Sequence, residues 1–330
     1  MRAILGLGSI LLALFGLPAA AEDSRRTSLD DLVAAVVHIK TSINPEGTSV
    51  DNLGRQREGS GVVIDESGLI LTIGYLMVEA QSAEVITNDG RTLPAAVVGY
   101  DHETGFGVLR TLEPPRLKPL PLGRSADVKE QDPALVASYG GAAMVLPVRI
   151  ASRREFAGSW EYLVDNAIFT NPPHPAWSGA ALINREGKLI GIGSLIVGNA
   201  KGEEEPSPGN MFVPIDLVGP ILGDLLDKGR ISGTGRPWIG LNAQAVHGRL
   251  FVGRVTPGSP AERAGLHKGD IIAGIGGEKT RTLAEFYRKM WALGAAGVKV
   301  PVDVLSDDNA RRVDVESVNR LDTLKLQTTY

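Results

Sequence analysis

The sequence contains no cysteine among its 330 residues, which excludes disulfides, thiolate catalysis and cysteine–zinc sites. Only five histidines are present, and their spacing matches no metal-binding motif. The 34 basic and 38 acidic side chains give a net charge of −4 and form no basic stripe. These absences predict a protein that needs neither metal nor cofactor and does not bind nucleic acid.

Long apolar runs are also absent, except for Ile4–Leu17 near the N-terminus. Arg2 precedes this run and the small residues 19–21 follow it, as in a secretory signal peptide. The run is shorter than the roughly 20 residues that a membrane-spanning helix needs. We therefore expect residues 1–21 to be a cleaved leader, with an uncleaved anchor as the alternative. The mature chain is expected to be exported, to the bacterial periplasm, without a stable membrane span.

Glycine and proline are abundant, with 40 and 20 residues, and they separate many short apolar segments. Gly59–Asp65 and Gly68–Thr72 are β-rich runs on either side of a turn, which predicts a hairpin. Further strands are predicted at 83–87, 93–98, 107–111, 134–138, 145–150, 162–169, 180–184 and 188–195. Many short strands at this spacing favour a β-sandwich or a β-barrel.

The pattern changes after Pro214. Apolar residues recur every three or four positions up to Lys228, and Gly229 follows, which predicts an amphipathic helix. The glycine-rich segment 231–236 predicts a linker. A smaller unit should follow, with strands at 238–241, 251–255, 271–275 and 298–305 and helices at 257–266 and 283–291. We therefore place one domain at 22–230, a second at 231–320 and a polar, mobile tail at 321–330.

Trp177–Leu182 reads Trp-Ser-Gly-Ala-Ala-Leu, the pattern of a serine-protease nucleophile loop with Ser178 as the nucleophile. A serine hydroxyl is a weak nucleophile until a nearby base takes its proton. No histidine lies between His38 and His102, and the segment 71–78 reads LTIGYLMV. The nucleophile position is therefore present, but the partner that should activate it is missing.

Four segments together resemble the HtrA-type (DegP-like) serine proteases. They are the glycine-serine-glycine hairpin 59–72, the segment 100–109, the nucleophile loop 175–184 and the stretch 211–241 with its Arg-Pro-aromatic-x-Gly sequence. The resemblance implies a mostly β fold, in which a trypsin-like double β-barrel is followed by a smaller α+β PDZ domain. It covers nearly all of the mature chain.

The resemblance also locates three departures around Ser178. Tyr75 stands at the place of the general-base histidine and Gly105 at the place of the orienting aspartate. Ala176 replaces a glycine whose amide helps to bind the oxyanion, and alanine disfavours the positive φ that such loops often use. Tyrosine, with an ordinary pKa of about 10, is a poor base near neutrality. Loss of the base alone lowers kcat by about 10⁶ in a well-studied protease.

His174, four residues before Ser178, is the substitute base to weigh against this interpretation, because a triad is defined by geometry rather than chain order. Prolines flank it and stiffen the segment, so a polar residue on the wall of the specificity loop is the simpler interpretation. Ser178 also has a simpler interpretation, as part of a Ser-Gly turn. The remaining histidines are interpreted as strand or surface residues: His38, His102, His247 and His267.

The second domain keeps the features that the resemblance implies for a PDZ domain. Pro237–Leu241 resembles the carboxylate-binding loop, whose backbone N–H groups hold a peptide's terminal carboxylate while the peptide adds as a strand to a sheet edge. The stretches 255–266 and 268–272 match the family's fold-marking residues. The implied peptide-binding residues are Trp238, Ile239, Gly240, Leu241, Phe286 and Met290. For Phe286 and Met290 a plain core role is the alternative.

The sequence therefore predicts an exported HtrA-like pseudoprotease that binds extended peptides or protein C-termini. It would serve as a scaffold, sensor or regulator in envelope protein quality control. Two alternatives stay open: an active serine endopeptidase in which Ser178 uses an unconventional base, and a structural subunit that modulates an active relative. Homo-oligomers and hetero-oligomers with such a relative both stay open. The end of the chain, Thr328–Tyr330, is a further candidate ligand for the PDZ groove.

Overall fold

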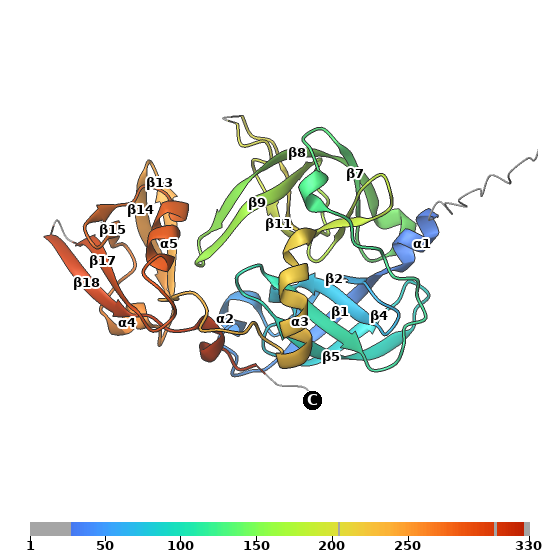
Figure 1. The fold of residues 1–330 in the computed structure, drawn as a ribbon, viewed down its shortest axis with the longest axis horizontal. Helices are drawn as coiled ribbons and strands as arrows, with labels where there is room; N and C mark the ends of the chain where they lie inside the picture. Colours follow the sequence, from blue (N-terminus) through green and yellow to red (C-terminus); the bar gives the residue numbers. More distant parts are fainter. Residues whose placement is uncertain (1–27, 204, 307–308, 327–330) are drawn as a thin grey trace, which may run out of the picture.

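The computed structural model of the protein describes residues 28–203, 205–306 and 309–326. Figure 1 shows two β-barrels on the right and a smaller sheet domain on the left. The predicted leader and the candidate ligand Thr328–Tyr330 lie outside the described residues. Within the described part of the chain, no helix combines the length and the apolar character that crossing a membrane requires.

The first barrel closes in the strand order β1-β2-β3-β6-β5-β4. Strand β3 is buried along its whole length, because Ile70 packs into this barrel while Leu71 and its alternate neighbours pack toward the second barrel. The elements are α1 (Leu29–Ala34), β1 (Val36–Ile43), α2 (Val50–Leu53), β2 (Gln56–Val63), β3 (Leu69–Ile73), η1 (Gly74–Leu76), β4 (Ala80–Ile86), β5 (Thr92–Tyr100) and β6 (Phe106–Thr111). The short helix η1 directly follows β3 and carries Tyr75.

The second barrel closes in the order β10-β11-β12-β9-β8-β7. Its elements are η2 (Ser125–Asp127), β7 (Pro133–Ala137), η3 (Gly141–Met144), β8 (Val145–Gly158), β9 (Tyr162–Asn171), β10 (Ala181–Ile183), β11 (Leu189–Val197) and β12 (Gly209–Pro214). Strands β8 and β9 are the longest of this barrel, and their hairpin extends from it toward the smaller domain (Figure 1). The turn at the tip of this hairpin spans 159–161.

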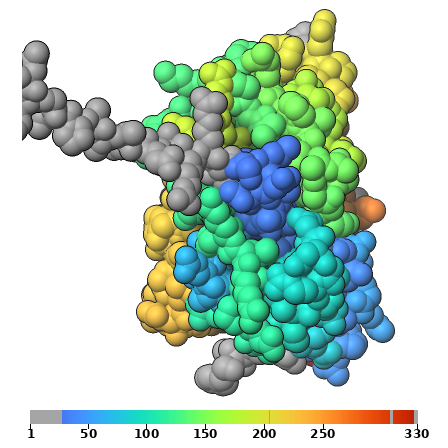
Figure 2. Space-filling model, turned by 90° about the vertical axis from the view of Figure 1, so that its right-hand side faces the viewer, coloured from blue at the N-terminus to red at the C-terminus, as the bar shows by residue number. Residues whose placement is uncertain are grey.

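The two barrels share an apolar interface. One cluster of buried side chains contains Leu71 and Phe106 from the first barrel together with Ala181, Ile192 and Val213 from the second. Helix α1 lies at the surface where the two barrels meet, as the blue patch in Figure 2 shows. The nucleophile loop and η1 both lie at this interface, so the fold brings their side chains together.

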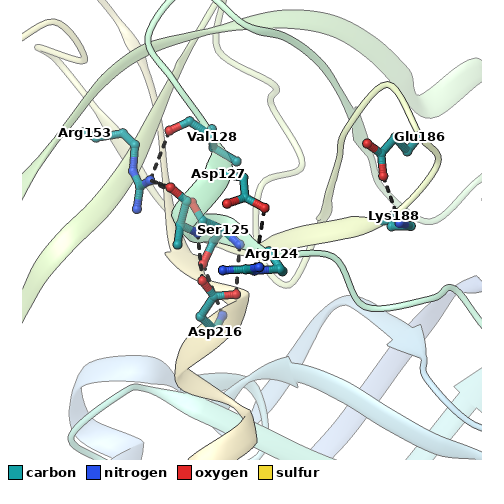
Figure 3. A network of polar contacts seen from close by, with 9 residues as sticks. Arg124, Ser125, Asp127, Val128, Arg153, Glu186, Lys188 and Asp216 are labelled. Carbon is teal, nitrogen blue, oxygen red and sulfur yellow. Dashed lines mark hydrogen bonds and ion pairs between the residues drawn. The ribbon is translucent and has the colours of Figure 1, made fainter.

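A polar network fixes the connection between the barrels to the base of the β8–β9 hairpin (Figure 3). The Asp216 carboxylate accepts hydrogen bonds from the N–H groups of Ser125 at 2.8 Å and Ala126 at 2.7 Å. Arg153 on β8 donates to the carbonyl oxygens of Ser125 at 2.7 Å and Val128 at 3.0 Å. The predicted helix follows as η4 (Ile215–Leu217) and α3 (Gly219–Lys228). It ends at a glycine in the left-handed region, as a helix C-cap favours.

The C-terminal domain is a sheet in the order β13-β14-β15-β17-β18, with β16 paired to β15. Its elements are β13 (Leu241–Val246), β14 (Arg249–Val255), α4 (Pro260–Arg263), β15 (Ile271–Ile275), β16 (Glu278–Lys279), α5 (Leu283–Trp291), β17 (Lys299–Ser306), β18 (Asn309–Glu316) and η5 (Arg320–Thr323). Strand β13 forms one edge of this sheet, and α5 packs over it with an apolar face that includes Phe286 and Met290.

The predicted mostly β architecture, a double barrel followed by a smaller domain, is confirmed. The strand predicted at 238–241 is wrong: Gly240 has φ +88, and β13 begins only at Leu241. In the described part of the tail, η5 extends to Thr323, and the Lys325 N–H donates to the Glu79 carboxylate at 2.8 Å. Strands β12 and β18 had no corresponding prediction.

Candidate functional site

The nucleophile loop packs directly on the first barrel. The carbonyl oxygen of Ser178 accepts a hydrogen bond from the N–H of Ser60, on β2, at 2.8 Å. Gly179 has φ +72, and a Cβ there would lie 1.9 Å from the Ser60 carbonyl oxygen, so glycine is required. The Ser60 hydroxyl lies 2.7 Å from that of Ser138 on the second barrel side. These contacts fix Ser178 at the junction of the barrels.

Tyr75 brings its hydroxyl to the hydroxyl of Ser178. The oxygens are 2.7 Å apart, and the Tyr75 oxygen is also 2.7 Å from the carbonyl oxygen of Ser194. A phenol has one proton and a carbonyl oxygen can only accept, so Tyr75 donates to Ser194. Ser178 must therefore donate its own proton to Tyr75, the residue predicted at the base position.

Tyr75 is poorly suited to take this proton. Burial raises the pKa of Tyr75 to about 12, although its hydrogen bond with Ser178 acts in the opposite direction. At pH 7 only about one molecule in 10⁵ would carry the phenolate that could act as a base. The neutral phenol holds the Ser178 hydroxyl in place without activating it.

A tyrosine from the second barrel fills the space beside Gly105. The carbonyl of Gly105 accepts a hydrogen bond from the Gly74 N–H at 2.7 Å, directly before Tyr75. A Cβ on Gly105 would lie 3.1 Å from the Tyr162 hydroxyl oxygen. That hydroxyl donates to the Thr104 carbonyl at 2.7 Å, and burial raises the pKa of Tyr162. The position predicted for the orienting aspartate thus has a buried phenol beside it.

The amide of Ala176 is engaged within its own loop. It donates to Nδ1 of His174 at 3.0 Å, whereas an oxyanion donor has to point at the substrate oxygen. Among the described residues, those with positive φ do not include Ala176. The amide predicted to be doubtful as an oxyanion donor therefore contacts a side chain instead.

His174 has no nitrogen left for Ser178. Its Nδ1 accepts from Ala176, so the ring proton is on Nε2, which lies 3.2 Å from the Met144 carbonyl oxygen. Burial lowers the pKa of His174, although these backbone contacts oppose the shift. The interpretation as a wall residue is wrong, because the side chain is buried and holds two backbone segments together.

The other four histidines lie in different segments of the chain. His38 is on strand β1, as predicted, and its ring stacks on Tyr139 with centroids 3.9 Å apart. His102 lies in a turn, as predicted, and is half-buried; its Nδ1 lies 2.9 Å from the Tyr100 hydroxyl, and burial holds its pKa well below the ordinary value. His247 and His267 are exposed on the C-terminal domain. Among the described residues, no group of three or more histidine, cysteine, aspartate or glutamate side chains could hold a metal ion.

The implied carboxylate-binding loop already contains a carboxylate, that of Glu161. Its Oε1 accepts from the N–H groups of Gly240 at 2.6 Å and Leu241 at 2.8 Å, and its Oε2 accepts from Ile239 at 3.1 Å. Glu161 lies at the tip of the β8–β9 hairpin and is 4 % exposed. Burial raises its pKa to about 7, although the three backbone donors oppose this shift.

The side chains predicted to bind peptide are buried. Ile239, Leu241, Phe286 and Met290 are at most 2 % exposed and belong to the core of the C-terminal domain. The guanidinium carbon of Arg320 lies over the Trp238 ring, 5.4 Å from its centroid. Phe286 and Met290 therefore lie in the core of the domain, which was the alternative to a peptide-binding role.

A cavity of about 620 Å³ lies beside Ser178, and all three units contribute to its walls. It is lined among others by Tyr100, His102, Trp160, Tyr162, Trp177, Gln244 and Arg320. The tip of the β8–β9 hairpin therefore contacts two places at once. Trp160 and Tyr162 face the cavity beside Ser178, while Glu161 between them enters the loop of the C-terminal domain.

Sequence reasoning missed Glu161, Tyr162 and Ser194. Ser194 contributes only a carbonyl oxygen, which every residue has, so no sequence signal marks it. Glu161 is an acidic residue between two aromatic residues at a strand turn, and that pattern alone was compatible with an exposed turn. Each acts through a partner far away in the sequence.

Known families match the two parts of the chain separately. Residues 59–192 match the trypsin-like peptidase domain and residues 237–316 match the PDZ domain. The chain is 29% identical over 240 residues to a protein of Hahella chejuensis named "Probable periplasmic serine endoprotease DegP-like", covering 68% of this chain and 49% of that protein. It is 28% identical over 273 residues to the "Periplasmic pH-dependent serine endoprotease DegQ" of Escherichia coli, covering 78% and 58%. The chain thus spans about half the length of these curated relatives.

Solved structures agree on the fold. The chain superposes on the HtrA-type protease AlgW with a decapeptide at a TM-score of 0.52 and 23% identity, covering 91% of this chain and 99% of that one. The same protease with a tripeptide gives a TM-score of 0.51 and 22% identity, covering 88% and 97%. At this identity the likeness supports the fold alone. The chain thus has a region that matches the trypsin-like peptidase domain, followed by one that matches the PDZ domain, and it is similar to the HtrA/DegP serine proteases.

Proposed function

We propose that this chain is an HtrA-like pseudoprotease, which binds peptide segments or protein C-termini and does not cleave them. The hydrogen bond from Ser178 to Tyr75 carries the proposal. The Ser178 hydroxyl donates to a neutral phenol whose own proton is given to the Ser194 carbonyl, so the serine has no base to remove its proton. A serine without a base is a weak nucleophile.

Two further contacts support the loss of peptidase activity. Tyr162 fills the space beside Gly105, and the Ala176 amide donates to His174 rather than toward a substrate. In a serine protease the triad and the oxyanion donors act as a unit, and loss of the base alone lowers kcat by about 10⁶. The three departures therefore act on base, orienter and oxyanion donor together.

Binding by the PDZ domain and the working compartment are extended to this chain from its relatives. PDZ domains bind an extended peptide along a sheet edge, with its carboxylate in a backbone loop. The relatives named above are described as periplasmic, and we place this chain in the same compartment. There it would act as a scaffold, sensor or regulator of envelope protein quality control, alone or together with an active relative.

A fluorophosphonate probe on the full chain tests the proposal. Trypsin serves as the positive control and Ser178→Ala as the blank. We expect no labelling above the blank at pH 7 to 8, because the Ser178 hydroxyl is not activated. Stoichiometric labelling that Ser178→Ala abolishes would overturn the pseudoprotease. Casein cleavage that depends on Ser178 would do the same.

A further inference from the structure

The tip of the β8–β9 hairpin lies in the PDZ groove in the manner of a bound peptide. The Ser159 carbonyl accepts a hydrogen bond from the Ala243 N–H, on edge strand β13, at 3.0 Å. On the other side of the groove the Tyr287 hydroxyl, from α5, donates to the Gly158 carbonyl at 2.7 Å. A ligand that extends a sheet edge and lies against the neighbouring helix makes contacts of this kind.

The carboxylate of Glu161 completes this likeness. It takes hydrogen bonds from three successive backbone N–H groups, at 239, 240 and 241, which is the arrangement that holds a terminal carboxylate. The Glu161 N–H itself donates to the Tyr287 hydroxyl at 3.2 Å. A side-chain carboxylate thus stands where the main-chain carboxylate of a ligand would stand, and both cannot be bound together.

The hairpin is held in the groove along its length. Leu163 and Ala157, on its two strands, pack with the apolar core of the PDZ domain. Arg288 on α5 forms ion pairs with Glu155 and Asp165, one on each strand. These exposed ion pairs contribute little by themselves, but they match the two faces in register. The contact therefore includes the groove, the carboxylate loop and the outer face of α5.

We infer that the β8–β9 hairpin is an internal ligand of the PDZ domain, and that polypeptides with a free C-terminal carboxylate bind only by displacing Glu161 from the loop. This inference rests on the proposed peptide binding, but not on the loss of catalysis. Because the groove binds peptide only in its open state, the apparent affinity is reduced by the open fraction. Displacement also frees the neighbouring Tyr162 from Gly105, which links the groove to the Ser178 cleft.

Hydrogen exchange on the full chain tests the occupancy without any ligand. In Glu161→Ala we expect exchange in the segment 238–242 to become at least about tenfold faster, because three amides lose their acceptor. Glu186→Ala is the matched control: Glu186 is an exposed glutamate in the β10–β11 turn of the same barrel. Exchange that stays as slow in Glu161→Ala as in Glu186→Ala would overturn the inference.

Peptide binding provides the second arm. The probe is a pool of fluorescein-labelled decapeptides with four randomised C-terminal residues, prepared with a free carboxylate and, separately, with a C-terminal amide. We expect the free-acid pool to bind Glu161→Ala about tenfold or more tightly than the native chain, and the amide pool to bind neither. Tyr287→Phe keeps the ring in the core but loses the bridging hydroxyl, and should give a smaller gain of the same sign.

Equal affinity of the free-acid pool for the native chain and for Glu161→Ala would overturn the inference. Fluorophosphonate labelling of the same samples reports separately on catalysis. Labelling of Ser178 would overturn the proposal of a pseudoprotease but not the proposal that the hairpin is an internal ligand. Amide exchange and peptide affinity that do not change in Glu161→Ala would overturn the internal ligand but not the pseudoprotease.

Discussion

The Ser178 cleft and the carboxylate loop at 239–241 are both occupied by side chains of the chain itself, but for different reasons. In the cleft, Tyr75 and Gly105 stand at the positions predicted for the base and its orienting residue, and no ligand can exchange them for a working base. In the loop, the binding sequence is intact and its occupant Glu161 comes from another domain. Under the two proposals, the loss of catalysis is set by the amino-acid sequence, whereas the closure of the groove is a contact that a ligand can reverse.

Glu79 offers the sharpest contrast with Glu161, because its buried carboxylate also accepts backbone amides. It binds the N–H groups of Thr48 at 3.0 Å, Ser49 at 2.8 Å and Lys325 at 2.8 Å. Since Glu79 joins two segments that are far apart in the sequence, we expect Glu79→Ala to lower the free energy of unfolding by about 3 kcal/mol. Urea denaturation measures this loss.

The matched control is Glu84→Ala, an exposed glutamate on β4 whose loss should cost less than about 0.5 kcal/mol. Equal effects of the two substitutions would mean that Glu79 is no more structural than a surface residue. Glu161→Ala should not lower the free energy of unfolding of the second barrel, since the hydrogen-bond donors to its carboxylate are in the other domain.

Introducing a histidine at position 75 and an aspartate at position 105 tests whether the sequence alone accounts for the unreactive Ser178. In Tyr75→His combined with Gly105→Asp we expect fluorophosphonate labelling of Ser178 to become about 10² faster, the lower end of what a general base contributes. The gain stays limited because the Ala176 amide still donates to His174. Tyr75→Phe is the control and should label no faster than the native chain. A native chain that labels and loses this labelling in Tyr75→Phe would make Tyr75 a base after all.

The groove should open with rising pH. Burial raises the pKa of Glu161 to about 7, above its ordinary value, so docking takes up a proton. The favourable contribution of Glu161 to docking of the hairpin is therefore present at low pH and is lost as the pH rises through about 7. Between pH 6 and pH 8 we expect the free-acid peptide pool to bind the native chain up to about tenfold more tightly.

Glu161→Gln should abolish this pH dependence, since glutamine does not titrate. The titratable and charged groups near Glu161 are Arg320, Tyr287 and His102. A profile that persists in Glu161→Gln would assign the pH dependence to one of these groups. Affinity that falls with pH in the native chain would contradict the docking contribution of Glu161.

The smallest expected effect concerns the packing of Tyr162 against Gly105. Gly105 and Gly90 have nearly the same φ, +85 and +86, but a Cβ on Gly90 meets nothing within 4 Å. Gly90→Ala should cost about 1 kcal/mol for the backbone alone, and Gly105→Ala about 0.5 kcal/mol more for the contact with Tyr162. Thermal unfolding of the two variants measures the difference. Equal losses of stability in the two variants would mean that Tyr162 moves away from the new methyl group at no cost in free energy.

The order of domains could be predicted because it is encoded locally. Short strands bounded by glycine and proline indicate barrels, and the apolar spacing up to Lys228 indicates the helix that follows them. The strand predicted at 238–241 failed because apolar residues in a row resemble a strand, whereas Gly240 at φ +88 turns the amides toward one point. The direction of this loop is fixed by a later segment of the same domain, since the Ala261 N–H donates to the Ile239 carbonyl and the Thr256 N–H donates to the Gly240 carbonyl.

The candidate site divides in the same way. Ser178, Tyr75 and Gly105 could be located from motifs, because each lies at a fixed offset within a recognisable segment. The burial of His174 and the role of Glu161 could not, since each depends on partners brought in by the tertiary fold. A long-range contact between two domains leaves no periodic pattern in a single sequence.

The PDZ domain is attached to the barrels at both ends of its chain. The linker 231–236 joins it to α3, and the segment after it returns to the first barrel through Lys325 and Glu79. A ligand held so close acts at an effective concentration on the order of millimolar. A free peptide has to compete against that value, so the domain would respond to a local accumulation of exposed C-termini rather than to single ones. The ratio of the apparent dissociation constants of the native chain and Glu161→Ala measures how strongly the internal ligand competes with a free peptide.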